Sequence, residues 1–214
     1  MILSLAFIAF LITKHLSDVN LRMPPYYVVE SIHGAGKGGK MHYDTVYHRL
    51  QPFDLVNQLG SHITRDDLEG KVTLVSFFHT SEQQVVPHLS ATLQKIQDTY
   101  ARSDSALRIL SITTNPEKDT VQALKAYADK YRANHDMWWF LTGNTQKISD
   151  MAKTDFQVTL QPSGTDSLLF SPVLILLDKH EYVRGYYNVM DSARVKKCVR
   201  DIALLMVEKT RNEE

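Results

Sequence analysis

Cysteine is almost absent from this 214-residue chain, which contains a single one, Cys198. One thiol can neither form an intramolecular disulfide nor run a dithiol redox cycle, so a disulfide framework and dithiol catalysis are both excluded. Cys198 stands among apolar residues at helical spacing, which favours a small buried side chain over a nucleophile. The sequence indicates no further role for it.

An excess of charge of either sign is also absent. Twenty-four Lys and Arg residues balance twenty-four Asp and Glu residues, the formal net charge is zero, and the pI is about 7.1. The basic residues are scattered singly among acids, which is typical of a solvated surface and gives no indication of nucleic-acid binding. With 43% hydrophobic and 22% charged residues, the composition is that of an ordinary globular protein.

Long hydrophobic runs are scarce, and the notable one is MILSLAFIAFLIT at residues 1–13. A membrane-spanning helix needs about 20 residues. The run resembles the apolar core of a signal peptide, but no basic residues precede it and no A-x-A site follows. It is an export or anchor segment that starts further upstream, a short uncleaved anchor, or a buried helix. We assign residues 1–16 to a signal or anchor segment and expect a membrane-anchored domain on the outer, periplasmic side.

Residues 17–44 are expected to form a tether that contains prolines and glycines. Its sequence HGAGKGGK, at residues 33–40, nearly matches a phosphate-binding loop. Met41 stands where that loop needs a hydroxyl group, and no helix is predicted to follow, so we interpret the stretch as a flexible linker. The compact domain is expected over residues 45–210.

Apolar periodicity predicts alternating strands and helices in this domain. An extended stretch over 46–56 turns at 57–60 into 61–64 and is predicted to be a β-hairpin. Further strands are predicted at Val72–Phe78, Leu107–Ile112, Trp138–Leu141, Pro172–Leu177 and Tyr182–Tyr187. Helices are predicted at Pro87–Arg102, from Asn115 onward, at Thr145–Asp155 and around Val195–Met206. This order indicates an α/β sandwich.

Several motifs resemble the Sco/SenC family in order and spacing. They are Asp67-x-Glu69-Gly70-Lys71 followed by a strand and His79-Thr80, then Ile112–Thr120, Trp139–Gly143 and Val183–Tyr186. The resemblance covers roughly residues 45–205. It implies a thioredoxin-like (Sco/peroxiredoxin-type) sandwich with an N-terminal β-hairpin. It also implies a membrane-tethered copper protein that helps to assemble the copper centre of cytochrome c oxidase.

The family's copper ligands are two cysteines in a C-x-x-x-C-P turn and one histidine. Carried over by position, the first cysteine falls on Glu82, the second on Val86 with the proline kept as Pro87, and the histidine on Phe170. Asn115 stands where the family has an aspartate. Because Cu(I) prefers thiolates, we expect no copper, other metal or cofactor at these positions.

We therefore expect a non-catalytic assembly or binding module in cytochrome c oxidase biogenesis, not an enzyme. Its partner would be a protein, such as an oxidase subunit or an assembly factor. The expected contact surface is the rim around the turn, which consists of Thr80, Ser81, Pro87, Ser171 and Pro172. The last two precede a core strand, where thioredoxin folds shape a partner groove.

The alternative is a metal carrier with a rewired site. His79, Glu82 and His88 lie within ten residues, and two imidazoles with a carboxylate could hold Zn²⁺ or Cu²⁺. The simpler interpretation is that these side chains face water at a helix terminus, where Glu82 complements the helix dipole.

Overall fold

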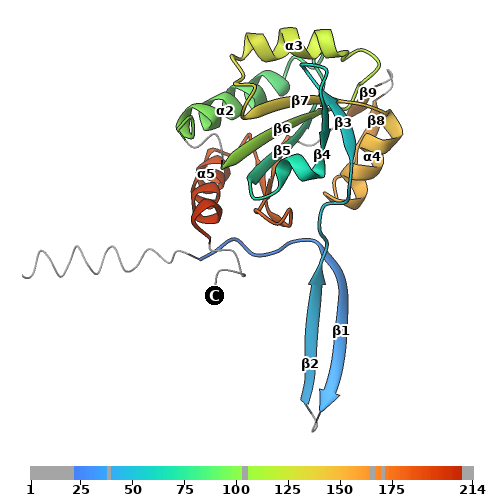
Figure 1. Cartoon of the computed structure of the whole chain (residues 1–214), viewed down its shortest axis with the longest axis vertical. Coiled ribbons are helices and arrows are strands. Elements are labelled where there is room, and N and C mark those ends of the chain that lie inside the picture. Colours follow the sequence, from blue (N-terminus) through green and yellow to red (C-terminus); the bar gives the residue numbers. More distant parts are fainter. Residues whose placement is uncertain (1–21, 38–39, 103–105, 164–166, 170–171, 209–214) are drawn as a thin grey trace, which may run out of the picture.

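The computed structural model describes residues 22–37, 40–102, 106–163, 167–169 and 172–208. The expected signal or anchor segment, residues 1–16, lies outside the described residues, as do Phe170 and Ser171. The described part has a globular domain from which a long β-hairpin projects (Figure 1). None of its helices is both long and apolar enough to cross a bilayer.

A seven-stranded sheet forms the centre of the domain, in the order β11-β10-β5-β6-β7-β3-β4. The three central strands β5, β6 and β7 are parallel, and the outer strands pair antiparallel. The strands are β3 Asp54–Asn57, β4 His62–Thr64, β5 Val72–Phe78, β6 Leu107–Thr113, β7 Trp138–Thr142, β10 Val173–Leu177 and β11 Val183–Asn188.

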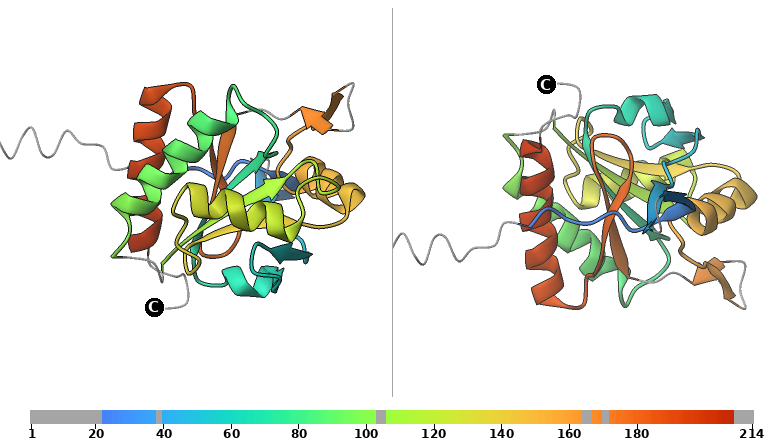
Figure 2. Two further views of the ribbon diagram at one scale, coloured as in Figure 1. Left: turned by 90° about the horizontal axis from the view of Figure 1, so that it is seen from above. Right: turned by 90° about the horizontal axis from the view of Figure 1, so that it is seen from below.

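Helices cover both faces of this sheet, which explains why its central strands carry buried apolar side chains on both faces. In β5, Val72, Leu74 and Phe78 pack into one core, whereas Val75 and Phe77 pack into the other. The first core is closed by α2 Val86–Thr99, α3 Val121–Lys130 and α5 Ser192–Val207, and the second by α4 Thr145–Thr154 and the 3-10 helix η1 Arg65–Leu68. Figure 2 shows α2 and α5 on the side of the sheet opposite α4.

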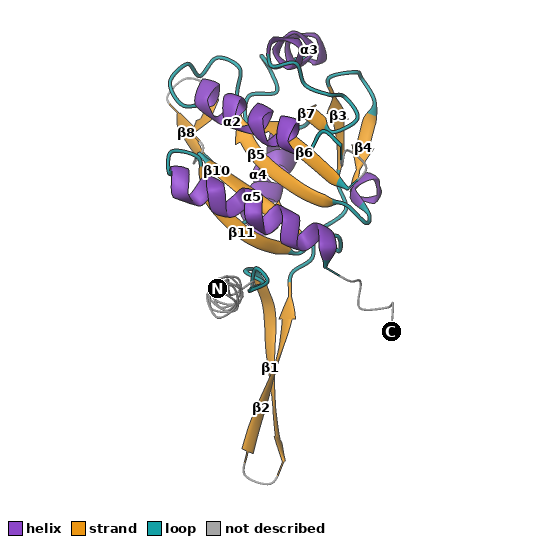
Figure 3. Cartoon of the chain, turned by 90° about the vertical axis from the view of Figure 1, so that its left-hand side faces the viewer, coloured by secondary structure: helices purple, strands orange, loops and turns teal. Residues whose placement is uncertain are grey.

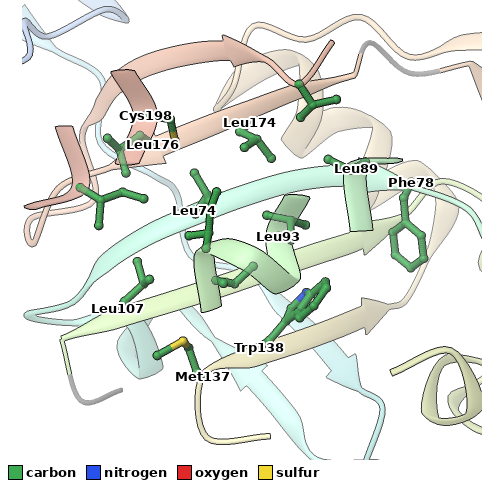
Figure 4. Packing of buried hydrophobic residues seen from close by; sticks show 14 of the residues in the cluster. Leu74, Phe78, Leu89, Leu93, Leu107, Met137, Trp138, Leu174, Leu176 and Cys198 are labelled. Carbon is green, nitrogen blue, oxygen red and sulfur yellow. The ribbon is translucent and has the colours of Figure 1, made fainter. Parts of the chain in front are cut away.

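The first core is filled by large side chains from distant parts of the chain. Leu74, Leu93, Leu176 and Cys198 lie on the same face of the sheet (Figure 4). The Cys198 side chain is fully buried, as the helical spacing predicted. Burial, with a smaller contribution from Asp201, raises the pKa of its thiol far above the ordinary value, so this thiol is chemically quiet.

The predicted α/β class is confirmed, and most element boundaries agree within a few residues. The predicted hairpin forms between β3 and β4, with a first strand shorter than expected. The helix predicted from Asn115 onward is wrong at its start, because α3 begins at Val121 and the Thr120 side chain caps it. Residues 115–119 form a turn instead, in which the Lys118 and Asp119 N–H groups donate to Asn115 O.

The tether contains more structure than the sequence indicated. Strands β1 Val29–Lys37 and β2 Lys40–Tyr47 pair along their length as an antiparallel hairpin that extends away from the domain (Figure 3). The expectation of a flexible linker over the glycine-rich stretch is therefore wrong for its described residues. A second, short hairpin of β8 Gln161–Ser163 and β9 Ser167–Leu169 was also not predicted.

Residues 22–28, here called the strap, connect the start of the described chain to the hairpin. The Tyr27 N–H donates to Val183 O of β11, and the His48 N–H donates to Val28 O. The buried Arg184 guanidinium donates to Pro24 O at 2.8 and 2.7 Å and pairs with Asp178 at 2.7 Å. These contacts fix the strap to the sheet edge and so orient the hairpin base.

Candidate functional site

The candidate site is the turn between β5 and α2, residues 79–85. It follows the end of a central parallel strand and leads into a helix N-terminus, a position where side chains from several elements converge. The Thr114 N–H donates to Phe78 O at 2.7 Å, which joins the end of β6 to the start of the turn. The turn contains the predicted site residues His79, Thr80, Ser81 and Glu82.

Glu82 lies in the turn, three residues before Val85, the N-cap residue of helix α2. Its carboxylate accepts hydrogen bonds from the backbone N–H groups of Gln84, Val85 and Val86 at 2.8, 2.8 and 2.6 Å. Burial opposes its charge, but the three N–H groups outweigh that effect and hold the pKa of the carboxyl below its ordinary value. One oxygen of Glu82 thus accepts an N–H group of the turn, and the other accepts the N–H groups of Val85 and Val86, which are free at the helix start.

Val86 and Pro87 open the helix. The Val86 side chain is fully buried in the first core, and Pro87 occupies the first turn, where its missing N–H group costs nothing. A side chain at position 86 therefore packs against the sheet, while Pro87 is half-buried at the rim.

Asp119 holds the turn from behind, and the sequence analysis did not identify this role. Its side chain is 1% exposed and accepts from the Thr80 N–H at 3.1 Å, the Thr80 hydroxyl and the Thr113 hydroxyl. The neighbouring Asn115 side chain is also buried, and its Oδ1 has no hydrogen-bond partner in the part of the chain that is described. The sequence offered little to predict this contact, since Asp119 is an acid four residues after Asn115 and lies 39 residues from Thr80.

The two histidines of the alternative metal site point to different surroundings. His79 is buried and its Nδ1 contacts Ser81 Oγ at 2.9 Å; burial lowers its pKa, against the opposing effect of Asp119 and Glu82. His88 instead contacts Val189 O at 3.1 Å and lines a groove of about 310 Å³ between α2 and α5.

No group of three His, Cys, Asp or Glu side chains within the described residues is arranged to hold a metal ion. The described residues therefore do not bring together His79, Glu82 and His88, the ligands of the alternative site, as one group. The physical reason is that backbone N–H groups at the start of α2 already bond to the Glu82 carboxylate. The first turn of α2 directs His88 towards Val189, which follows β11, and towards α5.

The residues at the carried-over ligand positions do not fit Cu(I). The Glu82 carboxylate offers hard oxygen atoms that already accept three N–H groups, and Val86 has no ligand atom and is buried. The third position, Phe170, and the rim residue Ser171 lie outside the described residues. The remaining rim residues Thr80, Ser81, Pro87 and Pro172 border the turn or precede β10.

Comparison with protein families gives one match over most of the chain. The model of the family described as SCO1/SenC matches residues 43–206. A SCO1 protein homolog from Bacillus subtilis (strain 168) is 27% identical over 167 residues, covering 77% of this chain and 86% of that protein. The matched region includes the turn, the Asp119 network and the whole central sheet.

Solved structures support the same assignment. A SCO1/SenC family lipoprotein from Bacillus anthracis str. Ames superimposes with a TM-score of 0.68 at 25% identity, covering 73% of this chain and 94% of that one. BsSco, described as a member of the Sco family of cytochrome c oxidase assembly proteins with a disulfide switch, gives 0.67 at 26% identity, covering 76% and 95%. The predicted thioredoxin-like Sco fold is confirmed.

Proposed function

Because this chain belongs to the SCO1/SenC family, we propose that it is an assembly module in the biogenesis of cytochrome c oxidase that works without the family's Cu(I) site. It would act by contacting a protein partner, an oxidase subunit or an assembly factor, and not as an enzyme. The role in oxidase assembly is supported by the relatives, among which BsSco is described in those terms.

One observation carries the ligand-free part of the proposal. At the two described positions where the family's cysteines would stand, Glu82 accepts backbone N–H groups at the start of α2, and Val86 packs in the core. Both residues thus have structural roles that keep the turn folded without a metal. The single buried Cys198 offers no substitute thiol, which supports the absence of disulfide exchange.

The partner surface in this proposal is the rim of the turn. Ser81 is exposed, Thr80 and Pro87 are half-buried, and Asp119 fixes the backbone that presents them. A pre-formed rim binds with little ordering cost. We also propose that residues 1–16 anchor the domain at the outer side of the membrane, which the description of the Bacillus anthracis relative as a lipoprotein supports.

A complementation assay tests this function. In the organism that encodes the chain, deletion of its gene is expected to lower cytochrome c oxidase activity, and the wild-type gene is expected to restore it. Glu82→Gln keeps an oxygen for the helix cap and should restore activity fully. Ser81→Trp places a bulky group on the rim and should restore much less, whereas the matched control Ser61→Trp, at an exposed turn between β3 and β4, should behave like wild type.

Two results would overturn the proposal. Unchanged oxidase activity after deletion would remove the assembly role. Full restoration by Ser81→Trp together with loss of activity in Glu82→Gln would mean that the carboxylate, and not the rim, performs the function.

A further inference from the structure

The β1–β2 hairpin is the largest described feature that the family match leaves out. The SCO1/SenC model begins at residue 43, so all of β1 and the first three residues of β2 precede it. In the described sheets, the hairpin pairs with no third strand. A two-stranded hairpin is only marginally stable alone in water, and both of its edges are open. A projecting hairpin of this kind is expected to be stabilised by contact with another surface.

The side chains of the strap and hairpin are unusually apolar for an exposed region. Ten large hydrophobic side chains are exposed among the residues that the structure describes. Seven of these ten belong to the strap and hairpin, namely Met23, Tyr26, Tyr27, Val29, Ile32, Tyr43 and Val46. Concentrated exposure of this kind marks an interaction site.

The register of the hairpin sorts these side chains onto two different faces. Ile32 pairs with Thr45, Gly34 with Tyr43 and Val29 with Tyr47, so these residues share one face. Ile32 is 61% exposed and Tyr43 is 68% exposed. We call this the apolar face of the hairpin; Tyr26 extends it at the base by stacking on Tyr47 at 4.7 Å. The opposite face carries Ser31, His33, Asp44 and Val46.

We propose that the apolar face of the hairpin lies on the surface of a lipid bilayer and holds the domain in a fixed orientation to the membrane. This rests on the proposed anchoring by residues 1–16. Tyrosines with aliphatic neighbours favour the membrane–water interface, where the ring is buried and the hydroxyl stays hydrated.

The length of chain before the described residues argues for a bilayer over other occupants. The apolar run ends at residue 13, and residues 14–21 can span at most about 28 Å before Arg22 begins the strap. The nine-residue strand β1 is itself about 30 Å long. Because Arg184 and Val183 hold the strap to the sheet, an anchored chain keeps the whole hairpin within reach of the lipid surface.

A fluorescence experiment on the full chain tests the proposal. Ile32→Cys, labelled with the polarity-sensitive dye NBD, is reconstituted into vesicles of phosphatidylcholine and phosphatidylglycerol. The buried Cys198 should not react with the dye, and wild-type protein treated with the same reagent verifies this. The matched control is His33→Cys, one residue away on the opposite face of the hairpin. We expect a blue shift for the Ile32 probe, and quenching by brominated lipid several-fold stronger than for the His33 probe.

Each other outcome overturns the proposal in a distinguishable way. If the protein floats with the vesicles but the two probes are quenched equally, the chain is anchored to the membrane and the hairpin does not lie on the bilayer. An emission shift that grows with the protein-to-lipid ratio without lipid quenching would mean that a second copy covers the face. If the full chain does not float with the vesicles, then residues 1–16 do not anchor it and the hairpin does not bind the bilayer.

Discussion

Replacing Arg184 with methionine should lower the free energy of unfolding by about 3–4 kcal/mol, because one buried cation holds three parts of the chain together. Its guanidinium pairs with Asp178, whose side chain is 2% exposed, contacts Glu208 at 3.1 Å and donates twice to Pro24 O. Burial opposes the charge of Arg184, but the two carboxylates outweigh burial and raise its pKa. Methionine keeps the aliphatic stem, yet leaves the Asp178 carboxylate buried without its cation. Urea unfolding of the full chain measures the loss.

A second readout separates this role from general destabilisation. Without the donors to Pro24 O, the strap should be released, so that limited chymotrypsin digestion at Tyr26 and Tyr27 becomes several-fold faster under native conditions. The control Arg194→Met removes an exposed arginine from α5 and should change stability by less than about 0.5 kcal/mol. A loss below about 1 kcal/mol for Arg184→Met, with unchanged cleavage of the strap, would contradict this account.

Removal of the Asp119 carboxylate should cost about 3 kcal/mol of stability and should loosen the β5–α2 turn. Asp119→Ala leaves the Thr80 N–H, the Thr80 hydroxyl and the Thr113 hydroxyl without their acceptor in a site that is 1% exposed. Unsatisfied buried donors carry the full cost of desolvation, and a charged acceptor makes stronger bonds than a neutral one. Thermal or urea unfolding gives the stability, and hydrogen exchange of the Thr80 amide gives the local opening.

The helix that follows provides the matched control. Asp129 lies on α3 with a side chain 57% exposed and pairs only with Lys125 at i,i+4, so Asp129→Ala should cost less than about 0.5 kcal/mol and leave the Thr80 amide protected. If Asp119→Ala unfolds as readily as Asp129→Ala, with Thr80 exchange unchanged, then Asp119 does not hold the turn.

The centre of the sheet could be predicted from the sequence because β5 and β6 carry apolar side chains on both faces and each leads to an amphipathic helix. Val72–Phe78 was predicted to the residue for that reason. The hairpin of β1 and β2 could not be predicted, because its glycines resemble a linker and its pairing is decided by register. The Asp119 network was missed because Thr80 and Asp119 are 39 residues apart, and only the parallel arrangement of β5 and β6 brings them together.

At the site itself, the sequence showed which ligands are replaced but not what the replacements do. Nothing local distinguishes a Glu82 that faces water from one that accepts three backbone N–H groups. The separation of His79 from His88 depends on where the first turn of α2 points, and that is decided by packing of the helix against α5 and β11.

A competitive Cu(I) titration of the full chain tests the central claim most directly. The matched variant Glu82→Cys/Val86→Cys/Phe170→His restores the family's ligand types at the carried-over positions and serves as the positive control. We expect weak Cu(I) binding by the wild type, unchanged in His79→Ala/His88→Ala, and an affinity at least about 1,000-fold higher in the restored variant, a difference of about 4 kcal/mol. Stoichiometric, sub-nanomolar Cu(I) binding by the wild-type chain would mean that the protein holds copper and that the proposed function is wrong.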